Sequence, residues 1–265
     1  MNLLESAANS IRHLSFLENK TGLWDAARPI YEAGLRIVYP RGLRRVVNGT
    51  DELFIDPRHR EVSTTYEPLV WRRIMDTLKV GDTAVDVGAY IGLYTIAMAK
   101  RVGAGRVFAF EPDVENRGAL ERHLSLNKLE AQVVTFPHAL GARREELPWA
   151  GGRSSESAIT PDGSDTVRAV TLDEVFQDQQ MDLLKIDVEG HEAEVLKGGA
   201  SLLQDQHRRP EHVFVEVHPF AWEEPGSAGP ELVDDLRRWG YTVTALDGDT
   251  SPSFDRVQWI IARVD

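Results

Sequence analysis

Residues 83–112 read TAVDVGAYIGLYTIAMAKRVGAGRVFAFEP, and this stretch decides the fold. Residues 83–87 are β-branched or apolar with one exception, which predicts a short strand buried on both faces. A turn with two glycines follows at 88–92, and residues 93–102 have the pattern of a helix. Residues 106–110 predict a second buried strand. Such strand–turn–helix–strand units form doubly wound α/β sheets, which bind ligands outside the carboxyl ends of their strands.

The residues around this turn favour a ligand that carries a ribose and a positive charge. Gly88 and Gly92 allow the backbone to approach a ligand closely. Glu111 ends the second strand, where its carboxylate can accept two hydrogen bonds from a ribose diol. The turn is G-x-x-x-G rather than the G-x-G-x-x-G of nicotinamide binders, and the charge of Asp86 disfavours a pyrophosphate. S-adenosylmethionine (SAM) meets these demands, and a glycine turn without a ligand is the structural alternative.

The chain also resembles a known family at two separate motifs. The sequence DVGAYIG at 86–92, with FEP at 110–112, is similar to motif I and its acidic partner in the class I SAM-dependent methyltransferases. LLKIDVEGHE at 183–192 and VLKGG at 195–199 resemble the signature of the FkbM-type methyltransferases. The resemblance covers roughly residues 62–220, and the two motifs together are highly specific.

This resemblance implies a Rossmann-like α/β fold, in which a mostly parallel seven-stranded sheet has helices on both faces. The C-terminal part agrees, because residues 241–246 and 257–264 predict two consecutive strands with no helix between them. Such a pair implies an antiparallel hairpin at the edge of the sheet. Residues 142–165 are polar and rich in glycine and serine, and we expect a hairpin there rather than an insert that closes over the site.

The resemblance further implies the residues that bind the cofactor. They are Glu67, Asp86, Gly88, Ala89, Tyr90, Gly92, Glu111, Pro112 and Ala139. Glu67 lies in a Y-E-P segment like the one that precedes motif I in the family, and its carboxylate can neutralise the cofactor ammonium. A glutamate that complements a helix dipole is the alternative. The family usually has Asn at the position of Tyr90, and its turn corresponding to Ala139 lies beside the adenine.

Acidic and imidazole side chains end two later strands. Residues 181–188 predict a buried strand with Asp187 at its carboxyl end, and Glu216 and His218 share a face at the end of the strand 211–217. Methyl transfer to a hydroxyl needs a group that removes the hydroxyl proton, and a positioned base contributes a factor of about 10²–10⁴. We prefer His218 as this base, with Asp187 and Glu216 as electrostatic partners.

Two other interpretations of this cluster stay open. The same three side chains could hold Mg²⁺ or another divalent ion, which would lower the pKa of an acceptor hydroxyl, and no metal ligand is assigned. The cluster could also simply close the strand ends. Lys185 shares a face with Asp187 and predicts a local ion pair. Glu189 and Glu192 open the next helix, where the helix dipole alone favours acidic residues.

Residues 1–60 are predicted to form a cap of helices and a hairpin, and residues 61–265 to form the methyltransferase domain. Residues 1–38 have helical spacing, and the pattern around Asn48-Gly49 predicts a hairpin with this pair at its turn. We expect the cap to lean on the cofactor domain. Its position suggests that it shapes the acceptor pocket.

The composition narrows the classes of function. The chain has 265 residues, no cysteine, a formal net charge of −12 and a sequence pI of about 5.2. The acidic balance argues against a nucleic-acid partner, whose phosphates need a basic face. The lack of cysteine excludes disulfides and thiolate metal sites and fits a reducing cytosol, so we expect a cytoplasmic protein. There is no apolar run of transmembrane length, and no membrane partner is expected.

We therefore expect a SAM-dependent O-methyltransferase that acts on a small-molecule hydroxyl. The resemblance points to sugars and secondary metabolites such as glycosides and polyketides. An N-methyl acceptor, a SAM-binding protein without catalysis and a nicotinamide-dependent oxidoreductase are the alternatives. The missing G-x-G-x-x-G and the charge of Asp86 argue against the oxidoreductase. The oligomeric state stays open, a homodimer included.

Overall fold

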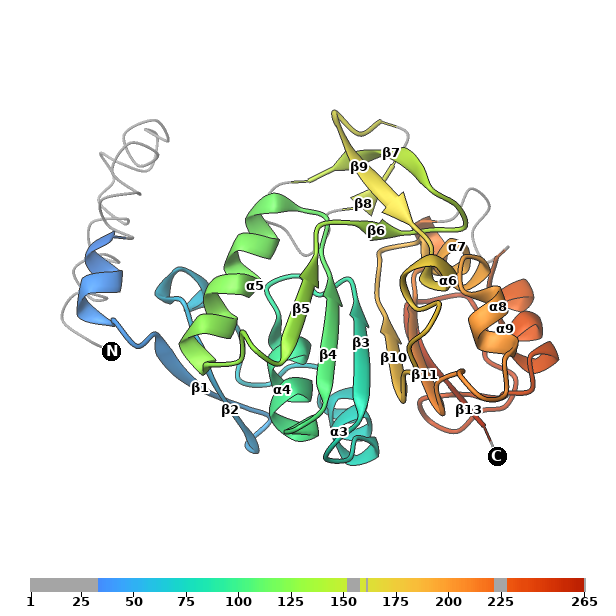
Figure 1. Cartoon of the computed structure of the whole chain (residues 1–265), viewed down its shortest axis with the longest axis horizontal. Coiled ribbons are helices and arrows are strands. Elements are labelled where there is room, and N and C mark those ends of the chain that lie inside the picture. The colour runs from blue at the N-terminus through green and yellow to red at the C-terminus, as the bar shows by residue number, and fades with distance from the viewer. Residues whose placement is uncertain (1–32, 152–157, 161, 222–227, 265) are drawn as a thin grey trace.

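The computed structural model describes residues 33–151, 158–160, 162–221 and 228–264 (Figure 1). Within these residues, a seven-stranded sheet of the order β12-β13-β11-β10-β3-β4-β5 forms the centre. The strands are β3 (Thr83–Val87), β4 (Arg106–Phe110), β5 (Val133–Phe136), β10 (Leu183–Ile186), β11 (His212–Val217), β12 (Thr242–Ala245) and β13 (Gln258–Arg263). The strands from β11 to β5 run parallel, whereas β13 is antiparallel to both β11 and β12. The predicted Rossmann-like α/β fold with an antiparallel edge is confirmed.

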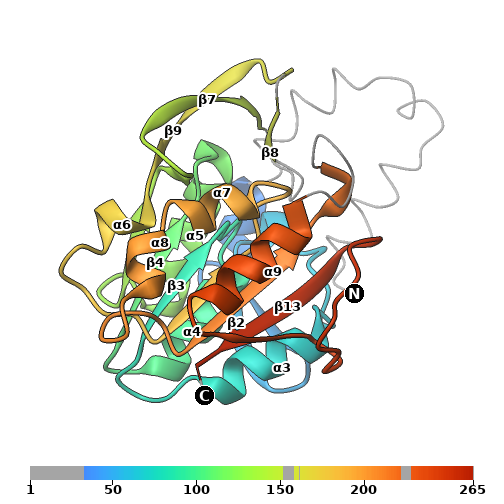
Figure 2. The same cartoon turned by 90° about the vertical axis from the view of Figure 1, so that its right-hand side faces the viewer.

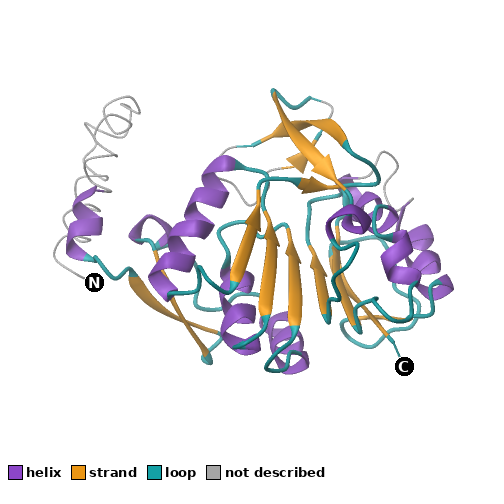
Figure 3. Ribbon diagram, viewed as in Figure 1, coloured by secondary structure: helices purple, strands orange, loops and turns teal. Residues whose placement is uncertain are grey.

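Helices cover both faces of this sheet (Figure 3). One face carries α3 (Pro68–Thr77), α4 (Leu93–Val102) and α5 (Val114–Asn127). The other face, which Figure 2 turns toward the viewer, carries α6 (Leu172–Val175), α7 (Glu192–Lys197), α8 (Ala200–Gln204) and α9 (Ala228–Arg238). Strand side chains alternate between the faces, so Ala84 packs with the first group of helices and Val85 packs with the second.

A second, smaller sheet lies over the carboxyl ends of the central strands (Figure 1). It consists of β6 (Ala139–Leu140), β7 (Glu145–Ala150), β8 (Ala158–Ile159) and β9 (Asp165–Val170), in the order β6-β9-β7-β8. Strands β7 and β8 pair antiparallel within residues 142–165, where the sequence predicts a hairpin, and β7 also pairs antiparallel with β9, which lies almost entirely beyond this segment. This hairpin also covers the site, so the two alternatives weighed for this segment are combined.

The predicted hairpin near the N-terminus is confirmed. Strands β1 (Leu43–Val47) and β2 (Asp51–Ile55) pair antiparallel around Asn48-Gly49. The hairpin packs against α5, where the Asn127 side chain accepts the Phe54 N–H at 3.0 Å and donates to the Phe54 carbonyl at 2.6 Å. Residues 33–38 are helical, and the helical prediction for the preceding residues lies outside the described part of the chain. The domain boundary near residue 60 stays a prediction.

Short 3₁₀ turns complete the backbone, η1 at Pro57–His59 and η2 at Pro219–Ala221. The second of these begins directly after His218, the residue that follows β11. In the described ranges, no helix is both long and apolar enough to cross a membrane.

Candidate functional site

The carboxyl ends of the central strands and the small sheet form a cavity of about 290 Å³. Nine of the twelve residues predicted for the site line it, namely Glu67, Gly88, Tyr90, Glu111, Pro112, Ala139, Asp187, Glu216 and His218. Three do not, namely Asp86, Ala89 and Gly92. The cavity therefore joins the predicted cofactor turn and the predicted catalytic cluster in one space.

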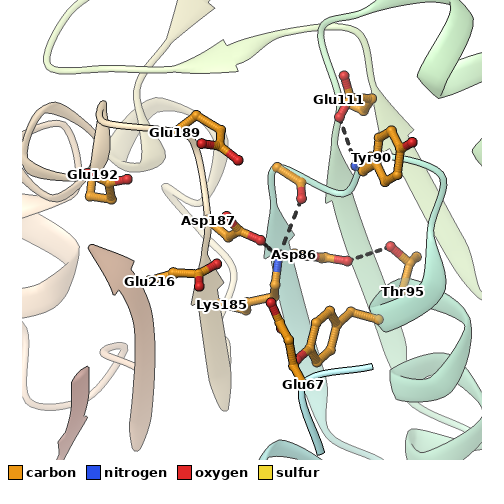
Figure 4. A network of polar contacts seen from close by, with 12 residues as sticks. Glu67, Asp86, Tyr90, Thr95, Glu111, Lys185, Asp187, Glu189, Glu192 and Glu216 are labelled. Carbon is orange, nitrogen blue, oxygen red and sulfur yellow. Dashed lines mark hydrogen bonds and ion pairs between the residues drawn. The ribbon is translucent and has the colours of Figure 1, made fainter. Parts of the chain in front are cut away.

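The glycine turn brings backbone directly to the cavity. Gly88 has φ of 78°, and a Cβ at this position would lie 1.7 Å from the carbonyl oxygen of Asp187. Only glycine therefore fits where the turn meets the end of β10. The next residue but one, Tyr90, donates its backbone N–H to Oε2 of Glu111 at 2.8 Å (Figure 4).

Glu111 is held by the backbone through both carboxylate oxygens. Oε2 accepts the Tyr90 N–H, and Oε1 accepts the Asp113 N–H at 2.9 Å. Burial raises the pKa of Glu111 to about 7, although these hydrogen bonds favour the charged form. Each oxygen keeps a further lone pair, so the carboxylate is still able to accept the hydroxyl groups of a diol.

Asp86 lies beneath the turn, on the face of β3 that packs against α4. Its side chain is fully buried, and Oδ2 accepts a hydrogen bond from the Thr95 hydroxyl at 2.6 Å (Figure 4). Oδ1 lies 3.1 Å from Nζ of Lys185, its register partner on β10. Two neighbouring side chains engage the carboxylate, and Asp86 does not line the cavity, so its predicted contact with a cofactor stays a prediction. Asp86 therefore supports the turn from below.

Ala89 and Gly92 do not line the cavity, and both contribute to the packing of the fold. Ala89 is buried in the core on the α4 side of the sheet. Gly92 is the N-cap of α4, and a Cβ there would lie 2.3 Å from Cδ1 of Leu120 on α5. The second glycine of the motif is therefore explained by the close packing of two helices.

Lys185 is fully buried between two acids (Figure 4). Besides its contact with Asp86, its Nζ lies 3.3 Å from Oδ2 of Asp187 and 3.4 Å from the carbonyl oxygen of Gly88. Burial opposes the charge, but the two carboxylates outweigh it and raise the pKa of Lys185. The predicted ion pair with Asp187 is confirmed, and it extends to the first motif.

The predicted catalytic cluster is brought together at the ends of β10 and β11. Asp187, Glu216 and His218 each present one atom within 4.8 Å of the other two. His218 is buried, and its Nε2 lies 3.5 Å from Oε2 of Glu189 and 3.9 Å from Oε2 of Glu216. Burial, followed by the charges of Asp187 and Glu67, raises the pKa of Glu216 to about 8.

Glu192 fixes the orientation of His218, a role that the sequence analysis missed. Its side chain is fully buried at the start of α7, and Oε1 lies 2.8 Å from Nδ1 of His218. Because a carboxylate only accepts, this contact places a proton on Nδ1 and leaves Nε2 toward the cavity. Burial lowers the pKa of His218, but the bond and charge of Glu192 outweigh it and raise the pKa to about 9.

Three residues of the cavity wall have backbone conformations that are rare outside glycine. Glu67 has φ of 40°, Tyr90 of 50° and Glu189 of 52°. Strain of this kind persists where the surrounding structure holds it, and it is often found at functional sites. The Glu189-Gly190 pair between a strand and a helix was the available signal for a sharp turn that presents Glu189 to the site.

The side chain of Glu67 faces the cavity and does not cap its helix. It stands at the N-cap position of α3 without a capping hydrogen bond, and its Oε2 accepts the Tyr94 hydroxyl at 2.6 Å. Burial raises the pKa of Glu67, and the nearby charge of Asp187 adds to this effect. Glu67 stands at the N-terminal end of α3, so both predicted roles, toward a cofactor ammonium and toward the helix dipole, stay open.

The small sheet adds Trp149 and Ile159 to the cavity wall. No sequence pattern indicated these residues, because the segment around them was interpreted as a surface hairpin. His138, which precedes Ala139, lines the cavity as well.

The match to a known protein family covers the part of the chain that holds both motifs. The family model described as methyltransferase FkbM domain matches residues 86–243. The hexuronic acid methyltransferase AglP of Haloferax volcanii is 26% identical over 155 residues, which cover 56% of this chain and 61% of that protein. This match thus spans less than two thirds of the archaeal protein. The methyltransferase sdnD of Sordaria araneosa is 28% identical over 218 residues, covering 68% of this chain and 80% of that protein.

Among solved structures, a SAM-dependent O-methyltransferase from Thermotoga maritima has a TM-score of 0.49 at 16% identity. The alignment covers 78% of this chain and 69% of that chain.

Proposed function

This chain belongs to the FkbM family of methyltransferase domains, and we propose that it transfers the methyl group of SAM to a hydroxyl group of a small-molecule acceptor. The observation that carries the proposal is the single cavity, which joins the glycine turn and Glu111 to the His218–Glu192 pair. We propose a sugar or secondary-metabolite hydroxyl as the acceptor. The name of the archaeal relative, a hexuronic acid methyltransferase, supports a sugar-like acceptor.

The residues of the cavity fit SAM in their chemistry. Glu111 offers an acceptor for ribose hydroxyl groups, the bare backbone of Gly88 allows close approach, and Glu67 offers a carboxylate for an ammonium group. The Ala139 segment forms the wall proposed to lie beside the adenine. When bound, SAM supplies an electrophilic methyl group on a positive sulfonium, and the acidic lining favours that charge.

His218 is the proposed base. Its Nε2 would remove the proton of the acceptor hydroxyl while Nδ1 stays bonded to Glu192, and Glu189 and Glu216 would stabilise the imidazolium. The raised pKa of His218 implies that the base form is the minor one at neutral pH. That pKa would fall when a positive charge enters the cavity, which favours the base form.

A divalent metal ion is the second candidate for activating the hydroxyl. Asp187, Glu216 and His218 present one ligand atom each within 4.8 Å, and carboxylate oxygens suit Mg²⁺. Such an ion would lower the pKa of a hydroxyl bound to it. Activity that EDTA abolishes and Mg²⁺ restores would favour the metal, whereas activity insensitive to EDTA would favour His218 acting without one.

Calorimetric titration with SAM, S-adenosylhomocysteine and NADH tests the cofactor. We expect dissociation constants of about micromolar for the two adenosyl ligands and no binding of NADH. Glu111→Ala should weaken binding of both adenosyl ligands strongly, because it removes the acceptor for the ribose. Glu121→Ala, at an exposed position of α5, is the matched control and should bind as the wild type does. Binding of NADH alone would instead support the oxidoreductase alternative.

Transfer of a radiolabelled methyl group to a panel of glycosides and polyketide alcohols tests the reaction. His218→Ala should retain cofactor binding and lower kcat by about 10²–10⁴. His207→Ala, at an exposed position, is the control and should retain full activity. Undiminished turnover by His218→Ala would reject this residue as the base. Cofactor binding without turnover on any acceptor would favour a SAM-binding protein without catalysis.

A further inference from the structure

We propose that Asn48, in the turn of the N-terminal hairpin, is a positioning residue that holds Glu67 in the cofactor site. The inference rests on the proposed role of Glu67 toward the cofactor ammonium. Asn48 itself does not line the cavity, and its sequence context is explained by a hairpin turn alone. Its side chain, however, makes contacts that a hairpin turn does not need.

The side-chain amide of Asn48 pairs with the backbone of Tyr66 in both directions. Nδ2 donates to the Tyr66 carbonyl at 2.7 Å, and Oδ1 accepts the Tyr66 N–H at 3.0 Å. The backbone N–H of Asn48 adds a bond to the Thr64 carbonyl at 2.7 Å. The amide thus fixes the peptide group that immediately precedes Glu67.

Glu67 needs such support because its backbone conformation is unfavourable for two separate reasons. It is left-handed, with φ of 40° and ψ of 56°, and it precedes Pro68, which disfavours compact conformations in the residue before it. Such a conformation persists only where neighbours determine it. Without the Asn48 side chain, the peptide that joins Tyr66 to Glu67 would lose the hydrogen bond at its carbonyl, and the peptide before it would lose the bond at the Tyr66 N–H.

Two further contacts hold Glu67, one at its backbone carbonyl and one at its carboxylate. The Trp71 N–H donates to the Glu67 carbonyl at 2.9 Å, and the Tyr94 hydroxyl donates to Oε2 of Glu67 at 2.6 Å. These contacts engage the carbonyl and the side chain of Glu67, whereas Asn48 engages the preceding residue, Tyr66. Held in this way, Glu67 lines the cavity together with Gly88 and Asp187.

The variant Asn48→Gly isolates the side-chain amide. Asn48 has φ of 51°, a conformation that glycine adopts freely, so the hairpin turn should be kept while the two bonds to Tyr66 are lost. We expect the dissociation constants of SAM and S-adenosylhomocysteine to rise about five- to tenfold, as the loss of one or two hydrogen bonds in a positioning contact would produce.

Asn127→Ala is the matched control. The Asn127 amide pairs with the backbone N–H and carbonyl of Phe54 in the same two-way manner, but Phe54 does not line the cavity. Both variants should lower the melting temperature, because each removes a clamp on the hairpin. Only Asn48→Gly should weaken cofactor binding. Equal weakening by both variants, or none by Asn48→Gly, would overturn the proposal.

A double-mutant cycle with Glu67→Gln separates positioning from general destabilisation. If Asn48 acts through Glu67, Asn48→Gly should change the dissociation constant of SAM less than twofold in the Glu67→Gln background. Effects that multiply in the double variant would show that Asn48 acts independently of Glu67, which contradicts the proposal. A Glu67→Gln variant with wild-type affinity would reject the proposed role of Glu67 itself.

Hydrogen exchange of the Trp71 amide gives a readout that does not depend on any ligand. This amide bonds to the Glu67 carbonyl, so its exchange should be faster in Asn48→Gly and unchanged in Asn127→Ala. If the wild type binds neither adenosyl ligand, the proposed function fails, yet faster Trp71 exchange in Asn48→Gly alone would still support the positioning of Glu67. Unchanged exchange in Asn48→Gly would overturn it.

Discussion

His218 has carboxylates facing both of its ring nitrogens. Nδ1 contacts Glu192 at 2.8 Å, and Nε2 faces Glu189 at 3.5 Å and Glu216 at 3.9 Å. Burial lowers the pKa of His218, but the acids outweigh this effect and raise the pKa to about 9. The imidazole of the free protein therefore carries a positive charge at neutral pH, and the neutral form grows as the pH rises.

This charge state predicts the pH dependence of catalysis. Because only neutral His218 is able to accept a proton, kcat/KM for SAM, which reports the protein without bound SAM, should rise about tenfold per pH unit from pH 6.5 and level off near pH 9. Glu216, whose pKa is about 8, titrates in the same window, so the profile reports the two groups together. Initial rates measured between pH 6 and pH 10 check this. A profile that is flat over the window would contradict a base with a raised pKa.

Glu189→Gln should move that profile to lower pH. The substitution removes one of the negative charges that raise the pKa of His218, and we expect the plateau to begin about half to one pH unit lower. Glu194→Gln changes the same charge on the exposed side of α7, where Glu194 pairs with Lys197. This control should leave the midpoint unchanged. An identical midpoint in Glu189→Gln would show that Glu189 does not act on His218.

At the scale of elements, charged side chains link β3 and β10. Lys185 of β10 stands opposite Asp86 of β3 in the parallel register, and it also contacts Asp187, which follows β10 directly. Helix α4 joins this network through the hydroxyl of Thr95. The two motifs that carry the family resemblance are therefore one physical unit, although they are far apart in the sequence.

Lys185→Met should destabilise this unit severely. Removing the cation leaves Asp86 and Asp187 without their buried partner, and such a loss costs about 3–5 kcal/mol. Lys197→Met removes an exposed ion pair within α7 and should cost about 0.5 kcal/mol or less. Urea unfolding of both variants measures the two free energies. Similar small losses in both would show that the buried network contributes little to stability.

The sequence predicts these elements well where periodicity and glycine mark them. The strand 83–87 and the following helix appear within their predicted bounds. The roles of Glu192 and Asn48 were not predictable in this way. Their partners, His218 and Tyr66, lie 26 and 18 positions away, and only the folded chain brings each pair together.

At the scale of the whole molecule, the small sheet has a core of its own. Trp149 packs there with Ala139, Val167 and Ala169, apart from the two larger clusters that flank the central sheet. This arrangement was not predictable, because strands as short as β6 and β8 carry too few residues for a periodic pattern. The cavity is thus lined both by residues of the central sheet and by residues of the small sheet.

Trp149→Ala should therefore loosen the small sheet alone. Removing this side chain leaves a gap in a core of few residues, and amides of β7 and β9 should exchange at least about tenfold faster. Exchange in β3 and β10 should stay as in the wild type. Leu184→Ala, in the central sheet, should instead lower global stability by about 2–5 kcal/mol. Equal acceleration in all strands of Trp149→Ala would show that the small sheet opens only with the whole molecule.

The position of β13 has a consequence for biosynthesis. It is the last described strand in the sequence, yet it lies inside the sheet, between β11 and β12. A nascent chain therefore exposes the open edge of β11 until residues 258–263 have left the ribosome, and β12 has no neighbour to join before then. Glu216 lies in β11 and His218 follows it directly, so this wall of the cavity has its strand neighbour only after β13 has been made. A ribosome that stalls before residue 258 would release a chain with an unpaired interior strand, the kind of edge that recruits other chains.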